Sequence, residues 1–229
     1  MNKYGQYCPI SRTAEVLGDR WTLHIVRDLL TGTSRFNELI RGNPGLSRAL
    51  LSRRLDQLER AGVIAHEASG DYRLTAAGRD LQPVVFGLAE WGARWTFGEP
   101  DAEELDADLL LWWLHRRLDA GTFPDRRFVI YVHFPDDPKR YWIVVEDDVS
   151  LCLSDPGFDV NLTVHSKLST LYRTYLGHQT LRDAFHDGQL DLNGSNAATR
   201  TFMDAFRQSP VGAIVAEATA PSSGAAPPD

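Results

Sequence analysis

The sequence predicts an α+β protein whose first half is mostly helical with one β-hairpin and whose second half is a β-sheet covered by helices. Three observations predict this division. Apolar side chains recur at helical spacing through most of residues 21–95. Segments that alternate apolar and polar side chains, as half-buried strands do, begin at residue 128. The charge also changes sign, because residues 1–97 carry 13 Lys and Arg against 10 Asp and Glu, whereas residues 98–229 carry 11 against 21.

The composition of the 229-residue chain excludes several classes of protein. With 43% hydrophobic residues, 24% charged residues and a net charge of -7, it is typical of a globular protein. The longest apolar run, residues 109–114, is far too short to cross a membrane, and residues 1–10 carry no secretory signal. Cys8 and Cys152 form no disulfide framework, so we expect a cytoplasmic protein with no membrane partner.

Charge and composition also predict the domain boundaries. A basic first half suits contact with nucleic acid, whereas an acidic second half does not. Gly98-Glu99-Pro100 breaks the last helical pattern of the first half, and from residue 218 the chain is rich in Ala, Pro, Ser and Gly. The predicted parts are a first domain at 1–97, a linker at 98–104, a second domain at 105–212 and a disordered tail at 213–229.

Two helices are predicted between residues 20 and 42. Trp21, Ile25 and Leu29 form an apolar stripe at helical spacing. Ser34 is expected to cap a shorter helix, which carries Phe36 and two apolar residues three and four positions further on.

A third helix and a hairpin come next. Asn43-Pro44-Gly45 is a turn, and Ser47 then caps a helix over residues 47–61. Two short strands, residues 63–67 and 72–74, flank a Ser-Gly-Asp turn. Two helices, a turn, a helix and a two-stranded wing together make a winged-helix arrangement.

Thr75 is predicted to cap a long helix with an apolar seam. The seam repeats at intervals of three and four residues, the heptad-like spacing that calls for a partner helix. Pro83 should kink or interrupt this helix near its start. The seam consists of Leu81, Val84, Leu88, Trp91 and Trp95.

The helix over residues 47–61 meets the demands that a DNA major groove makes on a recognition helix. Leu51, Leu55 and Leu58 fall within about 60° of one another on a helical projection, so one face packs on the domain. The opposite face is polar or small, and its positive residues lie toward the N-terminus, where the helix dipole favours phosphate. The side chains expected to read DNA are Ser47, Arg48, Ala49, Ser52 and Arg53.

Individual roles follow from side-chain chemistry. Arg53 is the expected guanine contact, because a guanidinium pairs bidentately with the acceptors of guanine. Arg35, at the start of the preceding helix, is placed for a phosphate, and Ser69 and Gly70 lie in the hairpin turn beside the DNA backbone. The alternative interpretation is a solvated helix face, which is what charged faces usually are. The wing and the local net charge of +3 favour DNA.

The motifs of the first half resemble those of HxlR-type winged-helix transcriptional regulators. The matching segments are Tyr7-Cys8-Pro9, Leu17-Gly18-Asp19-Arg20-Trp21-Thr22, Arg35-Phe36-Asn37-Glu38-Leu39, Gly45-Leu46-Ser47, Leu51-Ser52-Arg53-Arg54-Leu55 and Tyr72-Arg73-Leu74-Thr75. The resemblance covers about residues 4–95. It implies a domain that binds operator DNA in the major groove as a homodimer, joined through its first and last helices.

The second half begins with an apolar helix over residues 103–119. Beyond it, Phe128, Ile130, Val132 and Phe134 fall on one face of a strand. The predicted strands are residues 128–134, 141–146, 149–153, 160–165 and 189–193, with two helices before the last strand and a helix carrying Phe202 and Phe206 after it.

Residues 159–164 and 188–194, on either side of two predicted helices, resemble the sterol carrier protein type 2 fold, with a match over about residues 103–210. The resemblance implies an antiparallel or mixed sheet covered by helices around an apolar cavity, which in relatives takes lipids or fatty acyl chains. The candidate cavity residues are Leu109, Trp112, Trp113, Ile130 and Val132. The alternative interpretation of each is an ordinary core residue.

The sequence gives little support for redox sensing, metal binding or catalysis. In several HxlR-type proteins the cysteine that matches Cys8 senses oxidants, but a structural cysteine is the favoured interpretation because no resolving cysteine is near in sequence. The seven histidines show no metal-ligand spacing, so neither a metal nor a cofactor is expected. No phosphate loop, dinucleotide-binding glycine pattern or nucleophile elbow occurs, and we expect no enzyme activity.

These observations predict a dimeric, sequence-specific DNA-binding regulator, expected to be a repressor, whose second domain binds an apolar small-molecule effector. Its expected partners are double-stranded operator DNA and a second copy of the chain. The alternatives are a lipid or acyl carrier with a vestigial winged-helix domain, and an enzyme accessory domain built on the same cavity fold.

Overall fold

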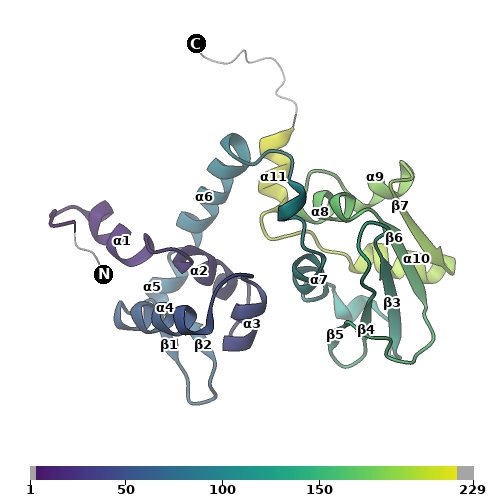
Figure 1. The fold of residues 1–229 in the computed structure, drawn as a ribbon, viewed down its shortest axis with the longest axis horizontal. Helices are drawn as coiled ribbons and strands as arrows, with labels where there is room; N and C mark the ends of the chain where they lie inside the picture. Colours follow the sequence, from purple (N-terminus) through teal and green to yellow (C-terminus); the bar gives the residue numbers. More distant parts are fainter. Residues whose placement is uncertain (1–3, 221–229) are drawn as a thin grey trace, which may run out of the picture. The chain divides into compact units, whose positions relative to one another are not determined.

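The computed structural model describes residues 4–220 and divides the chain into two compact units (Figure 1). The first unit ends at Ala89 and the second begins at Glu90, so the division falls inside helix α6 (Gln82–Trp95). The linker predicted at residues 98–104 stays a prediction. No helix within the described residues is both long enough and apolar enough to cross a membrane.

The first unit is a helical bundle with a two-stranded hairpin. Its elements are α1 (Pro9–Leu17), α2 (Thr22–Leu30), α3 (Phe36–Arg41), α4 (Arg48–Arg60), β1 (Ile64–His66), β2 (Tyr72–Leu74), α5 (Ala76–Arg79) and the first part of α6. Strands β1 and β2 are antiparallel, with Ala65 opposite Arg73. The core centres on Ile25, Leu39 and Leu51, each completely buried. The predicted winged-helix order is therefore confirmed.

Of the predicted caps at Ser47 and Ser34, the structure confirms the first and contradicts the second. Ser47 caps α4 as predicted, because its hydroxyl accepts a hydrogen bond from the backbone N–H of Leu50. The prediction that Ser34 caps α3 is wrong. Arg35 occupies the N-cap position, and the Ser34 hydroxyl donates instead to the carboxylate of Asp71.

The predicted long helix after Thr75 is two helices. Thr75 caps the short α5 by accepting from the N–H of Gly78, and α6 starts three residues after α5 ends. Gly78 passes so close to β1 that an added Cβ would lie 2.1 Å from the carbonyl oxygen of Val63. Pro83 is the second residue of α6, where a helix needs no N–H donor, so the predicted interruption at this proline is confirmed.

The second unit contains a five-stranded mixed sheet and a set of helices. Strands lie in the order β5 (Val149–Cys152), β4 (Tyr141–Val145), β3 (Phe128–His133), β6 (Leu162–Ser166) and β7 (Leu190–Gly194). All pairs are antiparallel except β3 and β6, which are parallel. The helices are α7 (Ala107–His115), α8 (Leu168–Leu176), α9 (Leu181–His186), α10 (Asn196–Ala205) and α11 (Gly212–Thr219), with short 3₁₀ turns at Ala102–Glu104 and Ala120–Thr122.

The two faces of the sheet differ. Ile130 and Val132 point to the face that packs with residues of α7, α8, α9 and α10 in one large core. The neighbouring strand residues point to the opposite face, where Val129, Trp142 and Val144 form a smaller cluster. The predicted α+β fold class, with helices covering a mixed sheet, is confirmed.

Two details of the second unit depart from the sequence prediction. The first predicted helix is shorter than residues 103–119, because Asp106 caps α7 and the helix ends at His115. Residues 213–219 belong to helix α11 rather than to a disordered tail, and Val215 is 3% exposed on it. The tail beyond residue 220 lies outside the described residues.

Candidate nucleic-acid interface

Helix α4 presents one apolar and one polar face. Leu51, Leu55 and Leu58 are at most 1% exposed, and they hold the helix on the core of the first unit. The five residues predicted to read DNA are all exposed: Ser47, Arg48, Ala49, Ser52 and Arg53. Burial of the leucines therefore leaves the polar face exposed, as a recognition helix requires.

Arg48 is held against helix α3. Its Nη1 donates to Oδ1 of Asn37 at 3.0 Å, and its guanidinium lies 4.9 Å from the centre of the Phe36 ring. Both contacts restrict the side chain without neutralising its charge. A cation fixed at the junction of α3 and α4 is suited to a phosphate beside the groove.

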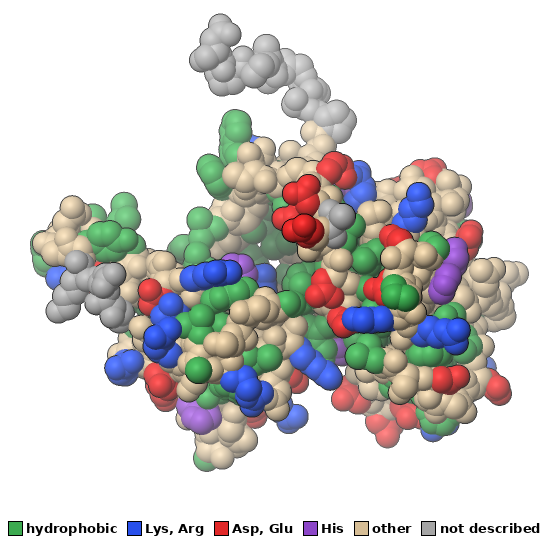
Figure 2. All heavy atoms as spheres, in the orientation of Figure 1, with side chains coloured by type: hydrophobic (Ala, Val, Ile, Leu, Met, Phe, Trp, Pro, Cys, Tyr) green, Lys and Arg blue, Asp and Glu red, His purple; other side chains and the backbone are tan. Residues whose placement is uncertain are grey.

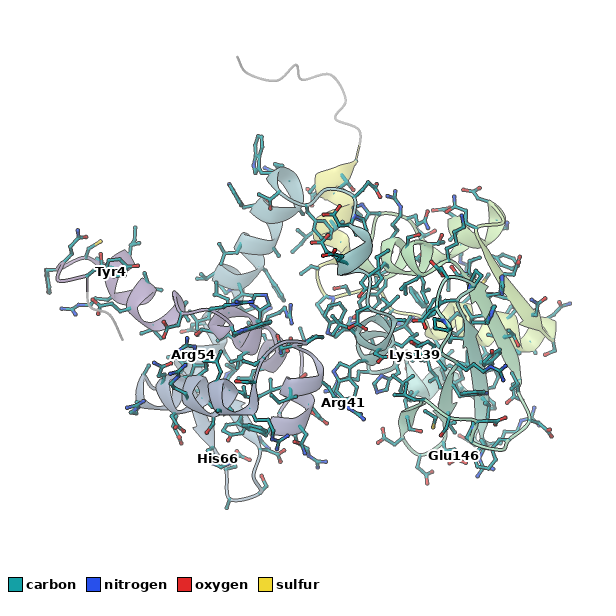
Figure 3. All side chains as sticks on the ribbon, viewed as in Figure 1. Tyr4, Arg41, Arg54, His66, Lys139 and Glu146 are labelled. Carbon is teal, nitrogen blue, oxygen red and sulfur yellow. The ribbon has the colours of Figure 1, made fainter. Side chains whose placement is uncertain are left out.

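The adjacent residues Arg53 and Arg54 have different surroundings. Arg53 is exposed, and its side chain makes no hydrogen bond or ion pair with any residue that the structure describes. Arg54 is only 11% exposed and donates to the Asp19 carboxylate at 2.8 Å and to the Gln57 amide oxygen at 2.7 Å. Its Nε also donates to the backbone carbonyl of Arg20. Arg54 thus fixes the rotation of α4, and Figure 3 shows it among the helices of this unit.

The wing is joined to the start of α3 by one carboxylate that the sequence analysis missed. Asp71 accepts from the hydroxyls of Ser69 at 3.0 Å and Ser34 at 3.1 Å, and Nε of Arg35 lies 3.5 Å from it. The hydrogen bonds from Ser69 and Ser34, and then the charge of Arg35, hold the pKa of Asp71 below its ordinary value. The backbone N–H of Tyr72 also donates to the Ser34 carbonyl. No local signal reveals the contact of Asp71 with Ser34, because the two residues are 37 positions apart.

The predicted backbone contacts lie on this part of the surface. Arg35 is exposed despite its contact with Asp71, and Ser69 and Gly70 are exposed at the hairpin turn, where Gly70 has a φ of +87°. Left-handed backbone at a hairpin turn favours glycine. Figure 2 shows Lys and Arg side chains on the visible face of the first unit.

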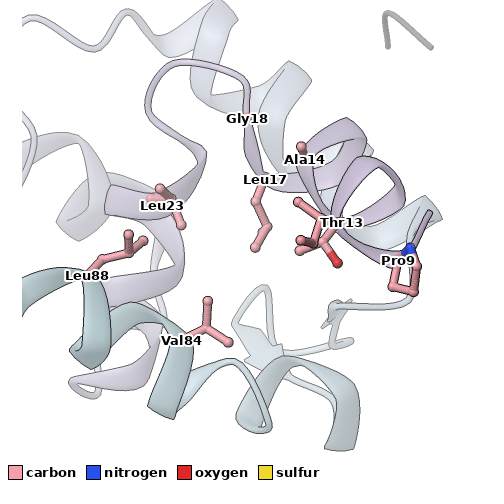
Figure 4. A pocket seen from close by; sticks show the side chains of 9 residues that line it. Pro9, Thr13, Ala14, Leu17, Gly18, Leu23, Val84 and Leu88 are labelled. Atoms are coloured by element: carbon pink, nitrogen blue, oxygen red, sulfur yellow. The ribbon is translucent and has the colours of Figure 1, made fainter. Parts of the chain in front are cut away.

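An apolar groove of about 380 Å³ opens between helices α1 and α6 (Figure 4). Its large apolar side chains that are exposed are Ile10 at 79%, Leu88 at 49% and Val84 at 45%. The other lining residues are Pro9, Thr13, Ala14, Leu17, Gly18 and Leu23. An exposed apolar groove marks a binding surface, and this one lies on the first and last helices of the predicted dimer interface.

Cys8 occupies the N-cap position of α1 as a free, half-buried thiol. Backbone N–H groups of Ser11 and Ile10 lower the pKa of Cys8. The other cysteine, Cys152, is also free and belongs to the second unit. The redox role of Cys8 stays a prediction.

The candidate effector cavity coincides with core positions. Ile130 and Val132 are buried in the large core of the second unit, and Trp112 is 9% exposed. Leu109 and Trp113 are half-buried, and the Trp113 ring stacks on Tyr175. This placement fits the alternative interpretation of ordinary core residues, and the cavity stays a prediction.

Comparison with known proteins concerns mainly the first unit. A family model described as HxlR-like helix-turn-helix matches residues 16–99. An HTH-type transcriptional regulator of Synechocystis sp. is 34% identical over 97 residues, which are 40% of this chain and 72% of that protein. The HTH-type transcriptional regulator YdeP of Bacillus subtilis is 33% identical over 94 residues, 38% of this chain and 73% of its own length. A solved structure of a UbiJ-SCP2 ubiquinone synthesis protein aligns with 62% of this chain and 97% of that chain, at 17% identity and a TM-score of 0.32.

Proposed function

Because the chain belongs to the HxlR-like helix-turn-helix family, we propose that it is a dimeric transcriptional repressor that binds a specific operator through helix α4. In this proposal each protomer places the exposed face of α4 in a major groove. The wing turn at Ser69 and Gly70 lies beside the backbone. A two-fold dimer then binds inverted half-sites about 34–36 Å apart, or a multiple of that distance.

The observation that carries the proposal is the exposure of Arg53 on a helix whose leucines are buried. A guanidinium that is bound by none of the residues 4–220 is available for bidentate contact with guanine. Arg35 and Arg48 flank it with cations that suit phosphate, and phosphate contacts set the position of the helix on the duplex. We assign base selection to Ser52 and Arg53.

Fluorescence anisotropy with the DNA upstream of the protein's own gene tests this assignment. Wild-type binding is expected to weaken steeply with salt and to resist random competitor DNA. Arg53→Ala should cost about 1–3 kcal/mol at the operator and relax the preference at one base position. Arg60→Ala is the matched control, because Arg60 is an exposed arginine at the far end of the same helix. If Arg53→Ala weakens operator and random DNA equally, Arg53 is a phosphate contact and the assignment fails.

The direction of regulation has a separate test. A repressor lowers transcription from a promoter that overlaps its operator. We expect a reporter driven by the upstream DNA to rise when the protein is removed and to stay high when only Arg53→Ala protein is present. An unchanged or falling signal on removal would contradict repression.

The second part of the proposal concerns an apolar effector bound by the second unit. It rests on the resemblance of residues 159–164 and 188–194 to the sterol carrier protein type 2 fold. An effector changes DNA binding only if it has different affinities for two states of the protein. Calorimetric titration with fatty acyl and aromatic ligands should give saturable heat, and a panel without binding would remove this part of the proposal.

A further inference from the structure

Two histidines meet on the sheet face opposite the main helix-covered core of the second unit. His133 of β3 and His165 of β6 are register partners on adjacent parallel strands, which lie side by side in Figure 1. Their neighbours Val132 and Val164 point into the core, so alternation along each strand turns both histidines to the other face. Both imidazoles are half-buried.

The ring nitrogens converge closely. Nδ1 of His133 lies 2.8 Å from Nδ1 of His165, and the ring centroids are 4.8 Å apart. Without a third group, one ring donates its Nδ1 proton to the other. Two nitrogens about 2.0–2.1 Å from one ion lie about 2.8–3.0 Å apart at a 90° angle and about 3.3–3.4 Å apart at a tetrahedral angle. The observed separation is that of an N–H···N hydrogen bond, and it also lies at the short end of the range for adjacent positions on a square-planar or octahedral ion, so the two nitrogens need to move apart little to bind one.

We propose that His133 and His165 form a two-histidine site for a divalent transition-metal ion, with a preference for Cu²⁺ or Ni²⁺. On binding, the ring that donates its Nδ1 proton adopts the other neutral tautomer, with the proton on Nε2. After a rotation of the rings, both Nδ1 lone pairs face the ion. Both imidazoles stay neutral, so no proton leaves the pair. Imidazole is a preferred ligand of these ions, and tetragonal coordination is typical of both.

The surroundings favour a cation. Asp191 on β7 is the register partner of His165 and is exposed, which adds a carboxylate beside the pair. Residues 98–229 as a whole carry 21 acidic against 11 basic side chains. Among the described residues no set of three or more His, Cys, Asp or Glu has metal-site geometry. The site therefore has two protein ligands, and water completes the coordination.

Calorimetric titration of the untagged full chain with CuCl₂ and with NiCl₂ tests the proposal. All measurements use a parent protein that carries Cys8→Ser and Cys152→Ser, so that no thiolate competes for the ion. We expect one ion per chain, and His133→Gln and His165→Gln should each weaken binding by at least about tenfold. His186→Gln is the matched control, because His186 is an exposed histidine on α9 of the same unit. This variant should bind the ion with the same affinity as the parent protein. Absence of binding, or binding that neither substitution weakens, overturns the proposal.

A second measurement needs no substitution at the site, so misfolding of a variant cannot decide the outcome. Substoichiometric Cu²⁺ is added to ¹⁵N-labelled protein, and the paramagnetic ion broadens amide signals near it. Signals around residues 133 and 165 are expected to disappear first. Broadening centred on another histidine, or spread evenly over the acidic surface, would show that the pair only shares a proton.

Discussion

If the groove between α1 and α6 joins the two protomers of the proposed dimer, replacing Leu88 by alanine should weaken their association without disturbing the core. Leu88 lines the groove between α1 and α6 and is 49% exposed. Complete burial of a leucine side chain contributes about 1.5–3 kcal/mol, so the exposed half has about 0.7–1.5 kcal/mol still to contribute. A two-fold interface uses the residue twice, which gives about 1.5–3 kcal/mol per dimer. The dimer dissociation constant should rise roughly ten- to a hundredfold.

Sedimentation velocity over a dilution series measures this change directly. Leu153→Ala is the control, because Leu153 is a leucine of similar exposure, at 58%, in the second unit rather than in the groove. Leu88→Ala should shift the monomer–dimer midpoint to higher concentration, and Leu153→Ala should leave it in place. A wild-type chain that is monomeric throughout the series, or equal midpoints for the two variants, would refute the assignment of the groove to subunit contact.

Two further predictions concern the first unit itself. Leu55→Ala opens a cavity beside Leu51 and Leu58, and Leu55 is 1% exposed, so urea unfolding of this unit should show a loss of about 2–5 kcal/mol. A loss below about 1 kcal/mol would contradict a closed core here. Asp71→Asn tests the wing. Because the folded-state pKa of Asp71 is lowered, its stabilisation is present above the unfolded-state pKa of about 3.9 and is lost as the pH falls through the folded-state value. The melting temperatures of wild type and variant should differ near neutral pH and converge in acid, and a constant difference would contradict the role of the carboxylate.

Local sequence signals predicted helix α4 and the caps of α4 and α5. Ser47 and Thr75 cap α4 and α5 as expected, because an N-cap hydroxyl bonds to an N–H only three residues away. The three leucines of α4 are buried as their spacing predicts. Cap and periodicity signals lie within one or two helical turns, so neighbouring residues are enough to reveal them.

Contacts between residues far apart in the chain could not be predicted from these local signals. Ser34 has the composition of a cap, yet its hydroxyl bonds to Asp71 across 37 positions. His133 and His165 have no ligand spacing along the chain, and only the parallel register of β3 with β6 brings their rings together. One sequence does not reveal which strands pair or which loop contacts which helix.

Helix α11 was missed for a different reason. Its residues, Gly212–Thr219, adjoin a segment of Ala, Pro, Ser and Gly, and the composition of the whole stretch suggested disorder. Burial of Val215 supplies the packing that the composition does not reveal. Tertiary contacts decide whether such a weakly apolar segment becomes a helix.

The residues that position α4 are different from those that it exposes to solvent. The contacts of Arg54 with Asp19 and Gln57 set the orientation of the helix, while Ser52 and Arg53 take no part in the packing. Substitutions at these two exposed positions should therefore change the free energy of unfolding by no more than about 0.5 kcal/mol. In the proposed binding mode, a substitution at Ser52 or Arg53 would therefore change the preferred operator and leave the fold of the first unit intact.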